Sequence, residues 1–140
     1  MRIFTFLLFF LPFSLSAQTV CTQESRERLD KILTELSQKD LSQKSIQELT
    51  VKIGQSFIGT PYVEKTLELT GEEKLVINLT GLDCTTYLET VVTLARISNS
   101  GNLNFEAFEM ELERLRYQDG IRKDYSSRLH YFSDWIYQNQ

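Results

Sequence analysis

Cys84 is the residue in this sequence best suited to chemistry, because it opens an amphipathic helix predicted to begin at Asp83. A thiol in the first turn of a helix faces unpaired backbone N–H groups and the positive end of the helix dipole. Both features favour the thiolate, which is the nucleophilic form. Asp83 at the N-cap position would stabilise the helix, but its charge beside the sulfur would disfavour the thiolate. A nucleophilic Cys84 would therefore need a histidine partner.

Two other interpretations of Cys84 stay open at this stage. The first is a small, inert residue buried in the core. The second is a disulfide with Cys21, since exported proteins do pair their cysteines. Cys21 lies close to the predicted start of the mature chain, where order is usually poor, and this weakens the disulfide.

His130 is the single histidine, so it is the candidate partner for a Cys84–His130 dyad. The alternative is a histidine hydrogen-bonded within an aromatic cluster, which is the commoner role for a lone histidine near apolar residues. Trp135 lies in the same segment, with Tyr131 and Phe132 nearby. These three could form a sugar-stacking surface, but core packing is the favoured interpretation.

Composition excludes several classes of function. The chain has 140 residues, a net charge of −4 and a pI near 5.1, so it lacks the basic face that a nucleic-acid partner needs. Two cysteines and one histidine exclude a four-ligand Cys/His zinc site, and no metal or cofactor is expected. A Gly-x-Ser-x-Gly elbow and a phosphate-binding glycine loop are both missing. Most carboxylates fall on solvent faces of helices, which disfavours a paired-carboxylate hydrolase.

Residues 1–17 have the layout of a secretory signal peptide. Arg2 precedes an apolar run from Ile3 to Leu11, and small residues near Ala17 offer a cleavage site. The run is about half the ~20 residues that a membrane-spanning helix needs. We therefore expect an exported protein, periplasmic or secreted, with no membrane partner after cleavage. Residues 18–140 are expected to form a single domain.

Hydrophobic spacing predicts helices over residues 23–38, 45–58, 83–96 and 105–118, and a short one within 129–137. Ser45 and Glu48 have the spacing of a capping box. Apolar residues alternate with other residues on both sides of the predicted turn at 70–73, at Leu67 and Leu69 and then at Leu75, Ile77 and Leu79, and predict a β-hairpin. The fold class expected from these elements is α+β, mostly helical.

Several motifs together resemble one family. Gly59-Thr60-Pro61-Tyr62 resembles the Gly-x-Pro-Tyr segment of papain-like cell-wall amidases of the NlpC type, and Asp83-Cys84 resembles the Asp-Cys that opens their nucleophile helix. The stretch 58–96 and the segment 125–136 are similar to the N-acetylmuramoyl-L-alanine amidase-like family of exported bacterial proteins. The similarity covers roughly residues 45–137.

The resemblance implies hydrolysis of the amide between N-acetylmuramic acid and L-alanine, with Cys84 as the nucleophile and peptidoglycan fragments as substrates. Tyr62 and Asp83, together with Arg128 and His130, are implied substrate-cleft residues.

The family's catalytic histidine lies in a later strand, in a His-Val-Gly-like segment that this sequence lacks, and His130 matches a mid-chain histidine instead. The sequence is therefore expected to be a truncated copy, the helical N-terminal part of the papain-like fold with its main sheet largely missing. A non-catalytic muropeptide-binding or remnant domain is the alternative, and nothing in the sequence indicates an oligomeric state.

Overall fold

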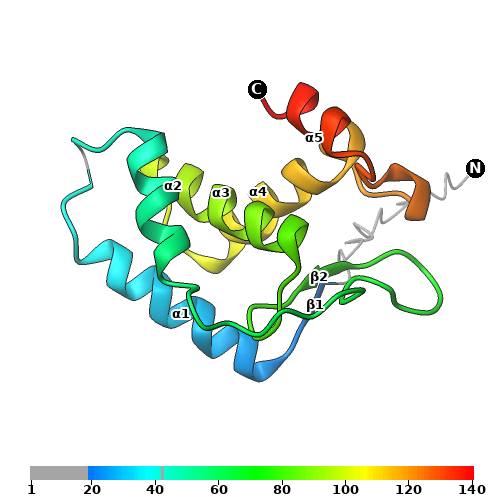
Figure 1. Ribbon diagram of the computed structural model, residues 1–140, viewed down its shortest axis with the longest axis horizontal. Coiled ribbons are helices and arrows are strands. Elements are labelled where there is room, and N and C mark those ends of the chain that lie inside the picture. The colour runs from blue at the N-terminus through cyan, green and yellow to red at the C-terminus, as the bar shows by residue number, and fades with distance from the viewer. Residues whose placement is uncertain (1–18, 42) are drawn as a thin grey trace, which may run out of the picture.

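The computed structural model describes residues 19–41 and 43–140, so the predicted signal peptide at residues 1–17 lies outside the described residues. Figure 1 shows how the elements follow one another in space. In chain order they are β1 (Thr19–Cys21), α1 (Gln23–Ser37), α2 (Ile46–Gln55), β2 (Leu75–Ile77), α3 (Cys84–Ser100), α4 (Phe105–Arg116), the short 3₁₀ turns η1 (Gln118–Gly120) and η2 (Tyr125–Ser127), and α5 (Phe132–Gln138).

The helices begin where capping side chains satisfy their first backbone N–H groups. Ser45 and Glu48 form the predicted capping box at the start of α2. Thr22 caps α1 and Asn104 caps α4 in the same way, each through its side-chain oxygen. The helices expected at 23–38, 45–58, 83–96 and 105–118 are confirmed, as is a short helix near the end of the chain, although α2 is shorter than predicted.

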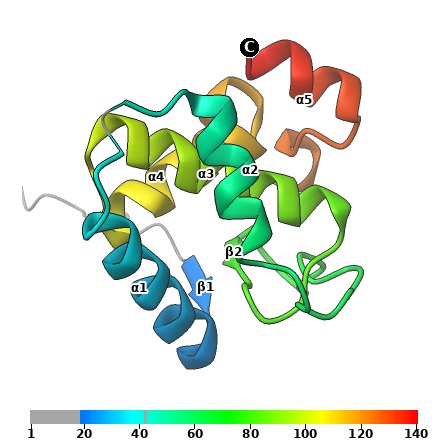
Figure 2. The ribbon, with the colours of Figure 1, turned by 60° about the vertical axis from the view of Figure 1, so that its left-hand side comes forward.

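The core lies around α3, which packs against α2 on one side and α4 on the other. Figure 2 shows α3 between these two helices, with α1 running beneath them. The buried cluster contains side chains from α1, α2, β2, α3 and α4, among them Leu29, Leu49, Leu75, Leu94 and Phe108. This single core carries the end of α3 at which Cys84 lies.

The predicted hairpin is wrong. Residues 67–69 form no strand, and Leu69 stays 45% exposed. Leu75–Ile77 instead pairs in parallel with Thr19–Cys21, so that Val76 lies opposite Val20. Three consecutive buried residues in β2 are typical of a strand covered on both faces, whereas a hairpin strand alternates between core and solvent.

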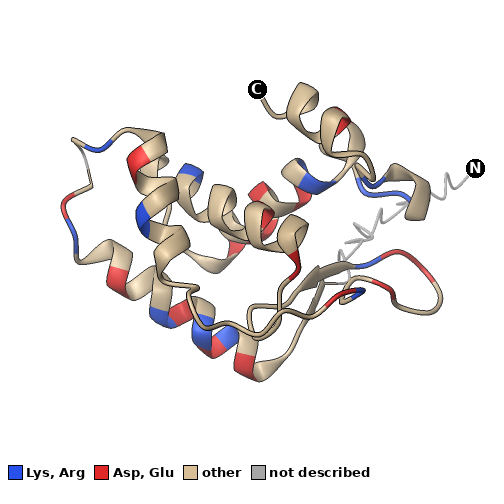
Figure 3. Cartoon of the chain, in the orientation of Figure 1, with Lys and Arg blue, Asp and Glu red and all other residues tan. Residues whose placement is uncertain are grey.

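The loop between α2 and β2 is tied to the segment between α4 and α5 by opposite charges. Figure 3 shows acidic residues on this loop and basic residues on the facing segment. Arg128 pairs with Glu73 at 2.6 Å and with Glu68 at 3.2 Å. These contacts bring residues more than 50 positions apart into one unit.

Within the described part of the chain, no helix is long and apolar enough to cross a membrane.

Candidate active site around Cys84

Cys84 is the first residue of α3, and its side chain is exposed. Asp83 is the N-cap: its Oδ1 accepts hydrogen bonds from the Thr86 backbone N–H and the Thr86 hydroxyl, both at 2.8 Å. The Asp83 N–H in turn donates to Thr86 Oγ1 at 2.9 Å. This reciprocal box fixes the first turn, and therefore the backbone from which the sulfur projects. The interpretation of Cys84 as a small buried residue is wrong.

Tyr62 lies beside the start of α3 because two segments pair there. The Leu82 N–H donates to the Pro61 carbonyl at 3.1 Å, and the Val63 N–H donates to the Leu82 carbonyl at 3.2 Å. Gly59, with φ of +88°, turns the chain from the end of α2 into this pairing. The backbone of the Gly-Thr-Pro-Tyr motif is thus held directly against the residues that lead into Cys84.

These segments enclose a shallow pocket of about 280 Å³ that contains the sulfur. Tyr62 and Tyr87 are both exposed, at 71% and 38%, and give the pocket aromatic walls. Phe57 meets Tyr87 edge to face, with ring centroids 6.2 Å apart. The pocket is lined by Phe57, Thr60, Tyr62, Leu82, Asp83, Cys84 and Tyr87. Sequence reasoning missed Tyr87, although its position three residues after Cys84 places it on the same face of the helix.

Arg128 lies apart from this pocket and is nearly buried, at 8% exposure. Its guanidinium donates to Glu73, Glu68 and the Leu67 carbonyl, at 2.6 to 3.2 Å. Tyr117 donates to the same Glu73 carboxylate at 2.7 Å. The structure thus shows Arg128 as a charged link between segments, and its contact with substrate stays a prediction.

His130 also lines no part of the Cys84 pocket. Its Nε2 lies 2.7 Å from the Tyr125 carbonyl oxygen, and its ring lies 4.4 Å from that of Tyr125. The side chain is exposed. This agrees with the alternative of a histidine hydrogen-bonded beside aromatic rings, and the structure does not bring together a Cys84–His130 dyad. Trp135 nearby is buried, as expected of a core residue. Tyr131 and Phe132 are 71% and 55% exposed, so the prediction of core packing is wrong for these two.

Cys21 and Cys84 are both free, so the structure contains no disulfide between them. Burial raises the pKa of the Cys21 thiol, and the charge of Arg26 only partly offsets this effect. Among residues 19–41 and 43–140, no group of three or more His, Cys, Asp or Glu side chains is placed to hold a metal ion.

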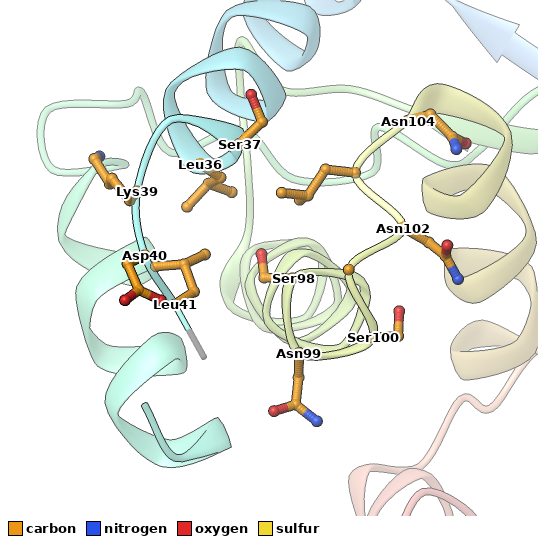
Figure 4. Close-up of a pocket in the computed structure, with 12 residues that line it drawn as sticks. Leu36, Ser37, Lys39, Asp40, Leu41, Ser98, Asn99, Ser100, Asn102 and Asn104 are labelled. Atoms are coloured by element: carbon orange, nitrogen blue, oxygen red, sulfur yellow. The ribbon is translucent and has the colours of Figure 1, made fainter. Parts of the chain in front are cut away.

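A wider hollow of about 690 Å³ lies at the opposite end of α3, about 25 Å from Cys84 at 1.5 Å rise per residue. Figure 4 shows Leu36, Leu41 and Ser98 facing its interior, while Asn99 points away. Ser98 already donates to the Leu94 carbonyl at 2.6 Å. The residues that line this hollow include no cysteine or histidine, so the pocket at Cys84 is the candidate site despite its smaller volume.

Comparisons with known proteins show the family of the chain. The family model described as AmiA-like, N-acetylmuramoyl-L-alanine amidase-like, matches residues 52–140. The chain belongs to this family. The matched residues include Cys84 and Asp83, Tyr62, and also Arg128 and His130.

Solved structures with the same arrangement come from Bacteroides. An N-acetylmuramoyl-L-alanine amidase from Bacteroides uniformis is 37% identical over 67% of this chain, with a TM-score of 0.63. A Bacteroides fragilis protein provisionally named a xylanase is 40% identical over 62% of this chain, with a TM-score of 0.58. The chain spans 39% of the length of the first and 38% of the second. The search of curated proteins gave no match.

Proposed function

We propose that this protein acts on peptidoglycan as an amidase, cleaving the bond between N-acetylmuramic acid and L-alanine with Cys84 as its nucleophile. The observation that carries the proposal is the exposed thiol of Cys84 at the first position of a capped helix, inside a pocket walled by Tyr62. The family to which the chain belongs, and the named activity of the Bacteroides uniformis protein, support the substrate class.

The proposed reaction proceeds through an acyl-enzyme. The Cys84 thiolate attacks the amide carbonyl and forms a C–S bond; the C–N bond then breaks, and the L-alanine amine leaves with a proton. Water attacks the thioester and releases the muramoyl carboxylate, which regenerates the thiol. Free backbone N–H groups in the first turn of α3 would stabilise the negative charge that develops on the carbonyl oxygen.

The residues around the sulfur have distinct proposed roles. Tyr62 and Tyr87 would hold the substrate between two aromatic walls, and Asp83 would fix the helix turn that presents the thiol. Arg128 and His130 stay outside the reaction centre in this proposal, because neither lines the pocket. Their contact with a more distant part of the muropeptide remains part of the hypothesis.

Proton transfer is the step that the described side chains do not supply. His130 is the single histidine of the sequence, and it lies against Tyr125 instead of Cys84. General acid–base catalysis contributes about 10²–10⁴-fold, so we expect slow turnover by these 140 residues alone. Imidazole in solution can occupy an open site next to an exposed thiol and provide the missing base.

The decisive experiment measures release of L-alanyl peptide from N-acetylmuramoyl-L-alanyl peptides, with and without added imidazole as a general base. We expect slow cleavage that imidazole accelerates, and no cleavage by Cys84→Ser or Cys84→Ala under either condition. Tyr125→Phe, which changes an exposed ring away from the pocket, is the matched control and should behave as the wild type. Cleavage that survives Cys84→Ala would remove Cys84 from the mechanism.

A second candidate function is binding of muropeptides without turnover. The observation that favours it is the absence, among the described residues, of a histidine at the Cys84 pocket. Calorimetry that shows saturable binding with no product, even with imidazole, would support binding alone.

We also propose that the protein is exported through residues 1–17, and that its helices belong to a papain-like fold of the NlpC type. The sequence layout of residues 1–17 supports export. The nucleophile at the start of the central helix supports the fold assignment. Mass determination of the protein recovered from the periplasm or medium, compared with the full 140 residues, tests the cleavage site.

A further inference from the structure

The side chains of Ser25 and Arg28 on α1 bind both backbone polar groups of one buried residue, Leu79. The Ser25 hydroxyl oxygen accepts from the Leu79 N–H at 3.1 Å, and Arg28 Nη1 donates to the Leu79 carbonyl at 2.6 Å. Ser25 and Leu79 are both fully buried. Since residues three apart lie on the same face of a helix, α1 holds Leu79 at two points separated by one turn.

Arg28 extends this link to the other side of the Cys84 pocket. Its Nη2 donates to Thr60 Oγ1 at 2.7 Å, and its guanidinium carbon lies 5.1 Å from the centroid of the Phe57 ring. Thr60 and Phe57 both line the pocket. One guanidinium therefore contacts the segment that carries Tyr62 and also the segment that leads into Cys84.

These two segments also contact each other directly, with the Val63 side chain lying over Gly81. They meet through the hydrogen bonds that Leu82 makes with Pro61 and Val63. Leu79 is followed by only three residues before the N-cap Asp83, so a shift at Leu79 passes along a short stretch of chain to the first turn of α3. Arg28 binds both paired segments, one at Thr60 and the other at Leu79.

We propose that Arg28 is a positioning residue for the Cys84 site: it holds the 57–62 and 79–83 segments at the spacing that places Cys84 beside Tyr62. The expected effect of Arg28 on cleavage rests on the proposed function, whereas its expected effect on the spacing of the two segments does not. Residues 52–140 match the family, so α1 lies outside the matched range and contributes to a site within it. A planar guanidinium with several donors suits this role, because a lysine ammonium cannot reach two separated acceptors with the same geometry.

The matched control is Arg26, two residues earlier on α1. Arg26 forms an exposed ion pair with Asp30 at 3.0 Å, and its guanidinium carbon lies 3.7 Å from the Phe105 ring centroid, on the side of α4. Arg26→Met and Arg28→Met therefore remove the same chemical group from the same helix. Only the second substitution removes contacts with the walls of the pocket.

Hydrogen exchange, resolved by peptide in the full chain, tests the structural part without any need for turnover. We expect Arg28→Met to speed exchange of the Val63 and Leu82 amides about tenfold or more, the size expected for loss of hydrogen bonds from a charged donor. Arg26→Met should leave both amides unchanged. Equal exchange in the two variants, or a change confined to α1, would overturn the inference. Should Arg28→Met fail to fold, Arg28→Lys carries the same test with a smaller expected acceleration.

Kinetics test the catalytic part, using muropeptide cleavage in the presence of imidazole. We expect Arg28→Met to lower kcat about tenfold with little change in KM, Arg28→Lys to recover part of that loss, and Arg26→Met to match the wild type. A wild type that cleaves, with an Arg28→Met variant that cleaves equally well, would overturn the positioning role. A wild type that never cleaves counts against the proposed function alone, and the exchange result then decides on Arg28.

Discussion

Glu89 of α3 and Arg116 of α4 form a buried ion pair, with 2.8 Å between Arg116 Nε and Glu89 Oε2. Both side chains are less than 5% exposed, and Arg116 also donates to the Val76 carbonyl of β2 at 2.7 Å. Burial raises the pKa of the Glu89 carboxyl, although the positive charge of Arg116 opposes the rise. The pair joins the helix that carries Cys84 to α4 and to the sheet.

Removing one partner of this pair should be far more damaging than removing both. Glu89→Ala leaves the Arg116 charge buried without its carboxylate, and we expect it to lower the free energy of unfolding by about 3–5 kcal/mol. The double variant Glu89→Leu/Arg116→Met replaces the charges by apolar groups and should recover much of that loss. Urea denaturation followed by far-UV circular dichroism measures both. A Glu89→Ala loss below about 1 kcal/mol, the size expected of a surface pair, would contradict this picture.

Glu73 should make part of the stability of the protein depend on pH. Burial raises the pKa of Glu73, but hydrogen bonds from Arg128 and Tyr117 outweigh burial and hold that pKa below its ordinary value of 4.5. Below pH 4.5 the unfolded chain therefore binds the proton more readily than the folded chain does. The contribution of Glu73 is complete above that pH and is lost as the pH falls through the lowered pKa.

The measurement compares the urea midpoints of the wild type and Glu73→Gln between about pH 3 and about pH 7, a range that spans the titration of ordinary carboxyl groups. Other carboxylates, such as Glu111 and Asp124, also have lowered pKa values, so both proteins should lose stability in acid. The wild type should lose more, and the difference between the two should shrink as the pH falls. Parallel pH profiles would show that Glu73 titrates alike in the folded and unfolded states.

The helices could be predicted because their signals are local. Ser45 and Glu48 marked the start of α2, and the Asp83-Cys84 pair marked the start of α3, within a few residues of each other in the sequence. The strand pairing could not be predicted, because β1 is only three residues long and lies far from β2 in the sequence. Val20 and its partner Val76 are 56 positions apart (76 − 20). Such a short parallel pair leaves no periodicity to detect.

The contacts that hold the site together were also outside the reach of sequence patterns. No local pattern in the sequence marks Arg28 as a side chain that binds Leu79 and Thr60. Glu89 directly follows Leu88, yet the carboxylate is buried and the leucine is only half-buried. In both cases the partner lies far away in the sequence, so only the assembled fold shows which charged side chains face inward.

The two free cysteines should differ in reactivity. Cys84 is exposed, whereas Cys21 is partly buried. Burial raises the pKa of Cys21, so its thiolate fraction at neutral pH is smaller than that of an ordinary thiol. Iodoacetamide at about pH 7.5–8, just below the ordinary pKa of a thiol, should therefore modify Cys84 first. Mass spectrometry of tryptic peptides from the folded protein measures the two rates separately. Faster modification of Cys21 would show that the thiol of Cys84 is less accessible than the structure indicates.

Asp83 allows the support of α3 to be separated from contact with substrate. Asp83→Ala removes the oxygen that accepts from Thr86, and loss of such a cap should lower the free energy of unfolding by about 0.5–2 kcal/mol. Asp83→Asn keeps an accepting oxygen at the same place and should cost only a few tenths of a kcal/mol, because asparagine is an equally good N-cap. Thermal unfolding of the two variants tests this order.

The same two variants then report on the predicted contact between Asp83 and the substrate. Asp83 lines the pocket that contains the sulfur, so its charge would act on any bound muropeptide. If Asp83 binds substrate through that charge, Asp83→Asn should raise KM for muropeptide cleavage while leaving the unfolding transition almost unchanged. If its role is confined to the cap, Asp83→Asn should keep the wild-type KM, and only Asp83→Ala should lose activity, in proportion to the disturbance of the first turn of α3.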